Sequence, residues 1–205
     1  MKSLVKMSMF MAIIAFAMTS CQKDNGPDLV SGAFDGKITA TVESSARPPA
    51  QVGIVVAWND PDIVNNRLVG NQIGYPVQYA SNRFSITLPN PPEDANMYTV
   101  KNVFEEMMNL GGGKPKYSNA SVKITSIDLL GFNSAGTTVY GTFECYTPDQ
   151  KTMCTFVYAE GDVNITGGKN LTVSLKKGWN RWFYTENVGI TTKAPEELRW
   201  YFVEL

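Results

Sequence analysis

Through most of its length the chain alternates apolar and polar residues with a period of two. Threonine separates Ile38, Ala40 and Val42 from one another, and serine separates Phe84 from Ile86. Successive side chains of a β-strand point to opposite faces, so this pattern predicts strands that each bury one face. Strands do not alternate with helices here, as they would in a parallel α/β fold. The chain is therefore predicted to be all-β.

Similar apolar and aromatic runs, separated by Gly, Pro and Asn turns, continue to the C-terminus. They cover residues 52–58, 75–79, 122–129, 139–146, 151–159, 171–175, 179–184 and 198–203. Short strands at this spacing are typical of a sandwich or a barrel. We expect an antiparallel β-sandwich, either single or built as two small packed sandwiches. A phase slip at Ser126 predicts a β-bulge in one strand.

One segment follows the helical period instead. Its apolar residues lie at i, i+3, i+4 and i+7 of one helix face, and they are Val100, Val103, Phe104 and Met107. Asn102 is the predicted N-cap, and Gly111 is the predicted end of the helix. The sequence thus predicts one short helix in a chain of strands.

Residues 34–205 are expected to form the folded ectodomain. The helix and the glycine-rich residues 111–115 could join two smaller sandwiches, 34–97 and 117–205, or could form a crossover within a single one. A first half of that size would make a marginal independent core. A single cooperative unit is therefore the preferred prediction.

The 205 residues include no histidine. This excludes Ser-His-Asp and Cys-His hydrolysis and every His-ligated metal or haem site. The 18 Lys and Arg residues are scattered, and 19 Asp and Glu residues balance them. Nucleic acid binding needs clustered positive charge, so nucleic acid is not an expected partner.

The N-terminus has the pattern of an export signal. Lys2 and Lys6 form a positive region, and residues 7–20 carry no charge. This apolar stretch is shorter than the ~20 residues of a membrane-spanning helix. Residues 1–20 are therefore predicted to be a secretory signal peptide.

The residues that follow resemble a known signal. Met18-Thr19-Ser20-Cys21 resembles the lipobox of bacterial lipoproteins, and Gln22-Lys23-Asp24-Asn25 resembles the export signal of Bacteroidota surface lipoproteins. The resemblance implies cleavage before Cys21, which becomes the acylated N-terminus. It also implies a lipid anchor in the outer membrane and, by the second motif, display on the cell surface. Residues 21–33, with Gly, Pro and Asp, are expected to be a flexible tether.

Cys145 and Cys154 flank a predicted turn in a hairpin. A four-residue loop would place Cys145 opposite Thr152, whereas a six-residue loop would place the two cysteines directly opposite. Only the second arrangement gives the close Cα approach that a disulfide needs. An exported protein meets an oxidising compartment, so we expect a disulfide. Two buried free thiols are the alternative.

Paired carboxylates are the enzyme chemistry that remains without histidine. The neighbouring candidates are Asp60 with Asp62, Glu105 with Glu106, and Glu196 with Glu197. All lie in segments where solvated charge is the expected explanation, so the chain is predicted not to be an enzyme and to need no cofactor. Oxygen ligands also gather in residues 59–66, but a polar turn is expected there rather than a metal site.

Aromatic residues are the remaining candidates for recognition. Alternation places Trp179, Arg181 and Phe183 on one face of a strand, and the predicted binding patch on the other. That patch consists of Asn180, Trp182 and Tyr184, with Trp58 and Asp60 as a second site on a separate loop. Flat rings suit recognition, including stacking on sugar faces. In the alternative interpretation both faces of this strand are covered.

Together these features predict a lipid-anchored envelope protein that acts as a non-catalytic binding module, with carbohydrate as the favoured ligand. The alternative is a structural or adhesive component that contacts another envelope protein through an edge strand or an apolar patch. A carboxylate enzyme is the third hypothesis.

Overall fold

The structure is a computed structural model. It describes residues 31–43, 45, 47–56, 62–64, 67–69, 72–93, 95, 97–108, 114–167, 170–185 and 188–205. Side chains are not described at 62–64, 67–69, 72–75 and 106–108. The signal peptide 1–20, Cys21, Trp58 and Asp60 lie outside the described residues.

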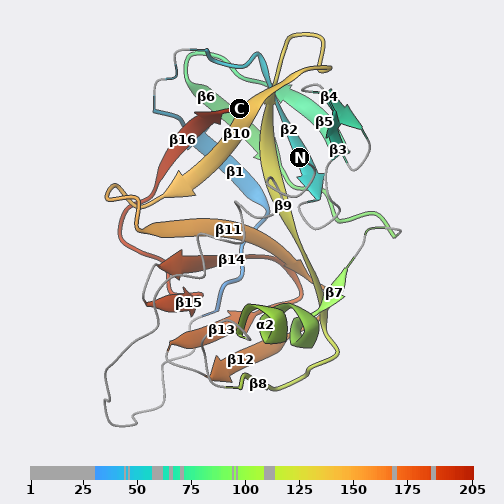
Figure 1. Cartoon of the computed structure of the whole chain (residues 1–205), viewed down its shortest axis with the longest axis vertical. Helices are drawn as coiled ribbons and strands as arrows, with labels where there is room; N and C mark the ends of the chain where they lie inside the picture. Colours follow the sequence, from blue (N-terminus) through green and yellow to red (C-terminus); the bar gives the residue numbers. More distant parts are fainter. Residues whose placement is uncertain are drawn as a thin grey trace.

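The prediction of an all-β fold is confirmed. The described residues form a sandwich-like arrangement of strands with one short helix, and Figure 1 shows two lobes along the long axis. The upper lobe contains β1 (Lys37–Thr41), β2 (Gln51–Val56), β3 (Asp62–Val64), β4 (Arg67–Val69), β5 (Gln72–Gln78), β6 (Arg83–Thr87), β10 (Val139–Tyr146) and β16 (Arg199–Glu204). In this lobe β1 pairs with β6, β2 with β5, and β10 with β16, all antiparallel.

The lower lobe contains the helix and the remaining short strands. These are β7 (Tyr98–Thr99), α2 (Val100–Met108), β8 (Lys116–Tyr117), β11 (Thr152–Ala159), β12 (Val163–Gly167), β13 (Leu171–Leu175), β14 (Gly178–Thr185) and β15 (Gly189–Thr191). The β13–β15 pairing is parallel, so the sheet is mixed rather than purely antiparallel. Within the described residues, no helix is long and apolar enough to cross a membrane.

Strand β9 (Lys123–Phe132) belongs to both lobes, and Figure 1 shows it running along most of the molecule. Ile124 packs into the lower core, whereas Ile127 and Leu129 face the upper core. The pairing of β9 with β11 runs from Ile127 to Ile124 through Ser126 without a shift, so the bulge predicted there is wrong. The phase slip in the sequence marks the point where the buried side chains of β9 change from the lower core to the upper core.

Two large hydrophobic clusters lie on either side of β11 and β14. The upper cluster includes Ile38, Phe84 and Phe143. The lower cluster includes Phe104 and Val173. Both strands contribute alternate residues to each cluster, so they form a layer between the two cores. Burial on both faces explains why these strands have few charged residues.

The two clusters do not correspond to the possible division into 34–97 and 117–205. Strand β2 from the first half pairs along β9 from the second half over six residue pairs. The upper cluster also combines residues of both halves, such as Val52 and Phe183. The early strands therefore build their core with strands that come much later in the chain.

The helix has its predicted place but a different cap. Val100, Val103 and Phe104 are buried as the helical period predicts. The helix already begins at Val100, and the Asn102 amide donates a hydrogen bond to Thr99 Oγ1 at 3.2 Å. Thr99 is therefore the N-cap, and Asn102 lies inside the first turn. The predicted end at Gly111 lies outside the described residues.

Residues 31–33, predicted as part of a flexible tether, are hydrogen-bonded to the lower lobe. The Gly32 amide donates to the Ser174 carbonyl at 2.8 Å, and the Arg181 amide donates to the Gly32 carbonyl at 2.8 Å. A Cβ at Gly32 would lie 2.7 Å from the Arg181 carbonyl oxygen and from a Thr192 methyl carbon. Glycine is thus the residue that lets this segment approach β14, and the prediction of a flexible tether is wrong for residues 31–33.

Candidate ligand-binding site

The predicted patch on β14 is not on the surface. Asn180 is 0% exposed and Trp182 is 6% exposed. The Trp182 ring meets Phe104 of α2 edge to face, with the ring centroids 5.5 Å apart. Tyr184 is half-buried and packs against the same lower core. The predicted binding patch is therefore wrong at Asn180 and Trp182, because both faces of β14 are covered.

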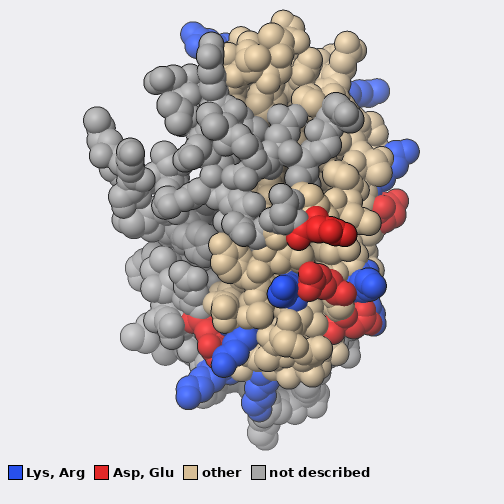
Figure 2. Space-filling view, turned by 90° about the vertical axis from the view of Figure 1, so that its right-hand side faces the viewer, with Lys and Arg blue, Asp and Glu red and all other residues tan. Residues whose placement is uncertain are grey.

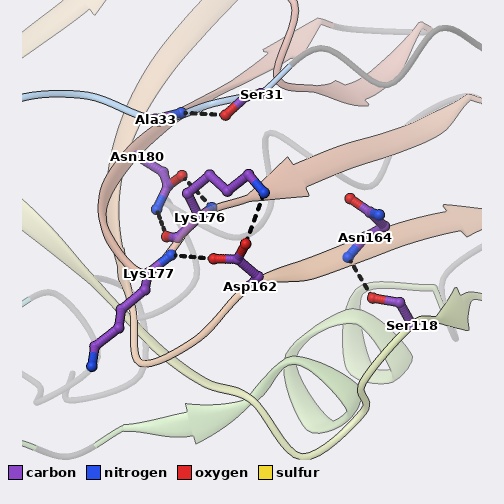
Figure 3. Close-up of polar contacts among 8 residues, drawn as sticks. All are labelled: Ser31, Ala33, Ser118, Asp162, Asn164, Lys176, Lys177 and Asn180. Carbon is purple, nitrogen blue, oxygen red and sulfur yellow. Dashed lines mark hydrogen bonds and ion pairs between the residues drawn. The ribbon is translucent and has the colours of Figure 1, made fainter.

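Asn180 has a structural role instead, which Figure 3 shows. Its Oδ1 accepts a hydrogen bond from the Lys176 amide at 2.8 Å, and its Nδ2 donates to the carbonyls of Lys176 and Gly178 at 2.7 and 2.8 Å. These bonds hold the turn between β13 and β14. Beside it, Asp162 accepts from Lys176 Nζ at 2.7 Å and from the Lys177 amide at 2.9 Å.

A surface hollow of about 360 Å³ lies at the far end of the upper lobe. It is lined by Arg47, Thr138, Val139, Tyr140, Glu204 and Leu205. The start of β10 and the end of β16 provide most of this lining. Its volume falls within the usual range of small-ligand pockets, ~300–1,000 Å³.

A break in strand pairing sets the position of Tyr140. Val139 pairs with Phe132 and Gly141 pairs with Gly131, so Tyr140 is an extra residue in β10. Such bulges re-aim a side chain and often lie near functional sites. Tyr140 is 42% exposed, although the neighbouring Val139 is fully buried. The bulge thus presents a tyrosine ring to solvent at the hollow.

Glu204, near the end of β16, also lines the hollow. Its Oε1 accepts hydrogen bonds from Ser45 Oγ and from the Arg47 amide, both at 3.1 Å. The Arg47 amide also donates to Ser45 Oγ at 3.1 Å. These contacts tie the backbone before β2 to the end of β16. Arg47 and Glu204 therefore line one hollow.

Thr138 is positioned by the turn that precedes β10. Asn133 Oδ1 accepts from the amides of Thr137 and Thr138 at 2.8 and 3.2 Å, and Asn133 Nδ2 donates to Thr138 Oγ1 at 3.3 Å. The lining of the hollow therefore includes a tyrosine, an arginine, a glutamate and a threonine. Sequence reasoning missed it because its residues come from three distant segments, none of which contains a motif.

A second polar cluster lies on the neighbouring strands. Leu129 of β9 pairs with Phe143 of β10, and the adjacent residues Asp128 and Glu144 interact electrostatically. Burial, and secondarily the charge of Glu144, raises the pKa of Asp128 to about 7. Glu144 accepts hydrogen bonds from Tyr146 OH at 2.8 Å and from Thr142 Oγ1 at 3.2 Å. Neither residue lines the hollow, so the pair is not part of the candidate site.

The described side chains of the acid pairs considered from the sequence lie in settings typical of solvated surface charge. Glu105, Glu196 and Glu197 are exposed, and Glu197 accepts a hydrogen bond from Arg199 Nε at 2.9 Å. The side chains of Asp60, Asp62 and Glu106 are not described. The described part of the chain holds no group of three or more Cys, Asp or Glu residues that could bind a metal ion.

Charge is mixed on the face shown in Figure 2, where basic and acidic residues are interspersed. Comparison of the chain with protein-family models, with curated proteins and with solved structures finds no match.

Proposed function

We propose that this protein is a lipid-anchored, surface-exposed envelope protein that acts as a non-catalytic binding module for carbohydrate. The observation that carries the proposal is the combination of groups at the hollow. The exposed ring of Tyr140 lies in the same lining as the charged side chains of Arg47 and Glu204.

These groups match the chemistry of a sugar ring. A sugar presents a face of C–H groups, which packs on an aromatic ring, and an edge of hydroxyl groups, which needs donors and acceptors. Arg47 offers only donors and Glu204 accepts when ionised, so together they suit the two roles of a hydroxyl group. Thr138 adds a hydroxyl.

The test is binding of the purified protein to a panel of bacterial and host glycans, compared with Tyr140→Ala. We expect the variant to lose about tenfold in affinity for the bound glycan, because stacking on the ring contributes about 1 kcal/mol or more. Tyr98→Ala is the matched control, because Tyr98 is 41% exposed but belongs to β7 in the lower lobe.

The control should bind as well as the natural protein. Absence of binding to every glycan on the panel would refute the carbohydrate proposal. An equal loss of affinity in both variants would refute the proposed site.

The anchor is tested separately at Cys21. We expect Cys21→Ala to shift the chain from the membrane fraction to the soluble fraction, because it removes the proposed acylation site. Protease added to intact cells should degrade the natural protein if it is displayed on the surface. Retention of the variant in the membrane fraction would contradict the anchor, and cleavage only after lysis would contradict surface display.

A further inference from the structure

Cys145 and Cys154 occupy directly opposite positions in the structure. The ladder between β10 and β11 pairs Cys145 with Cys154 and Tyr146 with Met153. At the base of the loop the Thr147 amide donates to the Thr152 carbonyl at 2.9 Å. Residues 147–152 therefore form the six-residue loop, which is the register that allows a disulfide.

This register also places the two sulfur atoms on one face. Directly paired residues of antiparallel strands point to the same side, with Cβ atoms about 4.5–5.5 Å apart. A disulfide needs about 3.5–4.5 Å between the Cβ atoms, so a small approach of the strands is sufficient. Both thiols are free and buried in the upper core, at 4% and 7% exposure.

The pair lies where the two lobes meet. Cys145 also pairs with Trp200 of β16, and Cys154 also pairs with Phe183 of β14. Strand β10 pairs with β16 over six residue pairs, and β11 pairs with β14 over eight, but β10 and β11 share only two. Figure 1 shows them diverging beyond this point. The Cys145–Cys154 pair is thus one of the two residue pairs in the β10–β11 ladder, the shortest of these three.

We propose that Cys145 and Cys154 are a disulfide-forming pair that joins β10 to β11 at the junction of the two lobes. The oxidant is an external disulfide, such as that of an exported thiol oxidoreductase. One cysteine thiolate attacks it and forms a mixed disulfide, and the second thiolate displaces the oxidant's thiol. Two protons and two electrons leave the cysteine pair, and the oxidant gains two thiols.

The surroundings determine when this reaction occurs. A hydrogen bond between the two thiols, and then burial, raise the pKa of Cys154 well above its usual value. The thiolate is the reactive form, so the folded, reduced pair is protected from oxidants. The bond therefore forms while the hairpin is still accessible during folding, and once buried it is shielded from reductants as well.

Trypsin provides a direct test, because Lys151 is the only cleavage site between the two cysteines. The full chain is isolated from the cell envelope, and free thiols are alkylated under denaturing conditions without reductant before digestion. We expect the peptides 124–151 and 152–169 to remain linked and to separate only after reduction. Recovery of both peptides as separate, alkylated species would overturn the proposal.

Two variants check the assignment. Cys145→Ser should release peptide 152–169 with an alkylated Cys154. The double variant Cys145→Ala/Cys154→Ala should have a Tm that reductant does not change. In the natural protein, reduction under partly unfolding conditions should lower the Tm by roughly 5–10 °C, because a closed loop of this size restricts the unfolded chain. A Tm that is equally insensitive to reductant in both proteins would overturn the role of the bond in joining the lobes.

Discussion

Asp128 is a residue whose ionisation the fold changes strongly. Its pKa of about 7 lies above the ordinary value of 3.8, because burial and the charge of Glu144 disfavour the carboxylate. The folded protein therefore binds this proton more tightly than the unfolded chain does. Its stabilising effect is complete below pH ~4, decreases as the pH rises, and is lost above pH ~7.

Replacing the carboxyl by its amide removes this pH dependence. We expect Asp128→Asn to be more stable than the natural protein by about 2 kcal/mol at pH 8, and the difference to vanish near pH 4. Urea unfolding at several pH values measures both. Asp162→Asn is the control with the opposite sign, because Lys176 lowers the pKa of Asp162 and the carboxylate form is favoured there. A natural protein as stable as Asp128→Asn at pH 8 would contradict the assignment.

Single residues also show where sequence reasoning fails. The period of β14 correctly separates its two faces, with Phe183 in the upper core and Trp182 in the lower one. Alternation does not reveal whether the second face meets solvent or another core, since that depends on which strands pack on it. The absence of charge at Asn180, Trp182 and Tyr184 was the available signal that this face is buried.

At the scale of elements, local sequence patterns predicted well where strands and the helix occur, but poorly which strands pair with one another. Strands β1, β6, β13 and β14 were all predicted within one or two residues of their observed bounds, and helix α2 was predicted in its place but with a cap three residues too late. The hairpin of β10 and β11 was predicted, but its short ladder was not. Both strands pair with β9, and beyond their short shared ladder β10 pairs mainly with β16 and β11 mainly with β14.

Strand β9 illustrates the same limit within one element. Its burial changes from one core to the other along ten residues, so its apolar pattern has no single phase. A bulge is the local explanation of a phase slip, and a change of partner is the tertiary one. The two cannot be separated without knowing the fold.

At the scale of the whole molecule, the ends of the described chain lie in different lobes. The segment that begins at Ser31 is held by the lower lobe, and the hollow lies beside the last residues of β16 in the upper lobe. Figure 1 shows β13 and β14 below β10 and β16 along the long axis.

The candidate site could not be predicted from the sequence because no local pattern marks it. Arg47 precedes β2, Tyr140 is the extra residue in β10, and Glu204 is near the end of β16. Each is ordinary by itself. Only the pairing of β16 with β10 and the contacts of Glu204 with residues 45–47 bring them to one hollow.

Mapping a bound glycan by NMR tests the central claim most directly. The backbone amides of the isotopically labelled protein are followed while the glycan identified on the panel is added. We predict that shifts concentrate at residues 138–141 and 204–205, with Arg47 among them, and that they disappear in Tyr140→Ala. Shifts that concentrate in the lower lobe, or that persist unchanged in Tyr140→Ala, would contradict the proposed site.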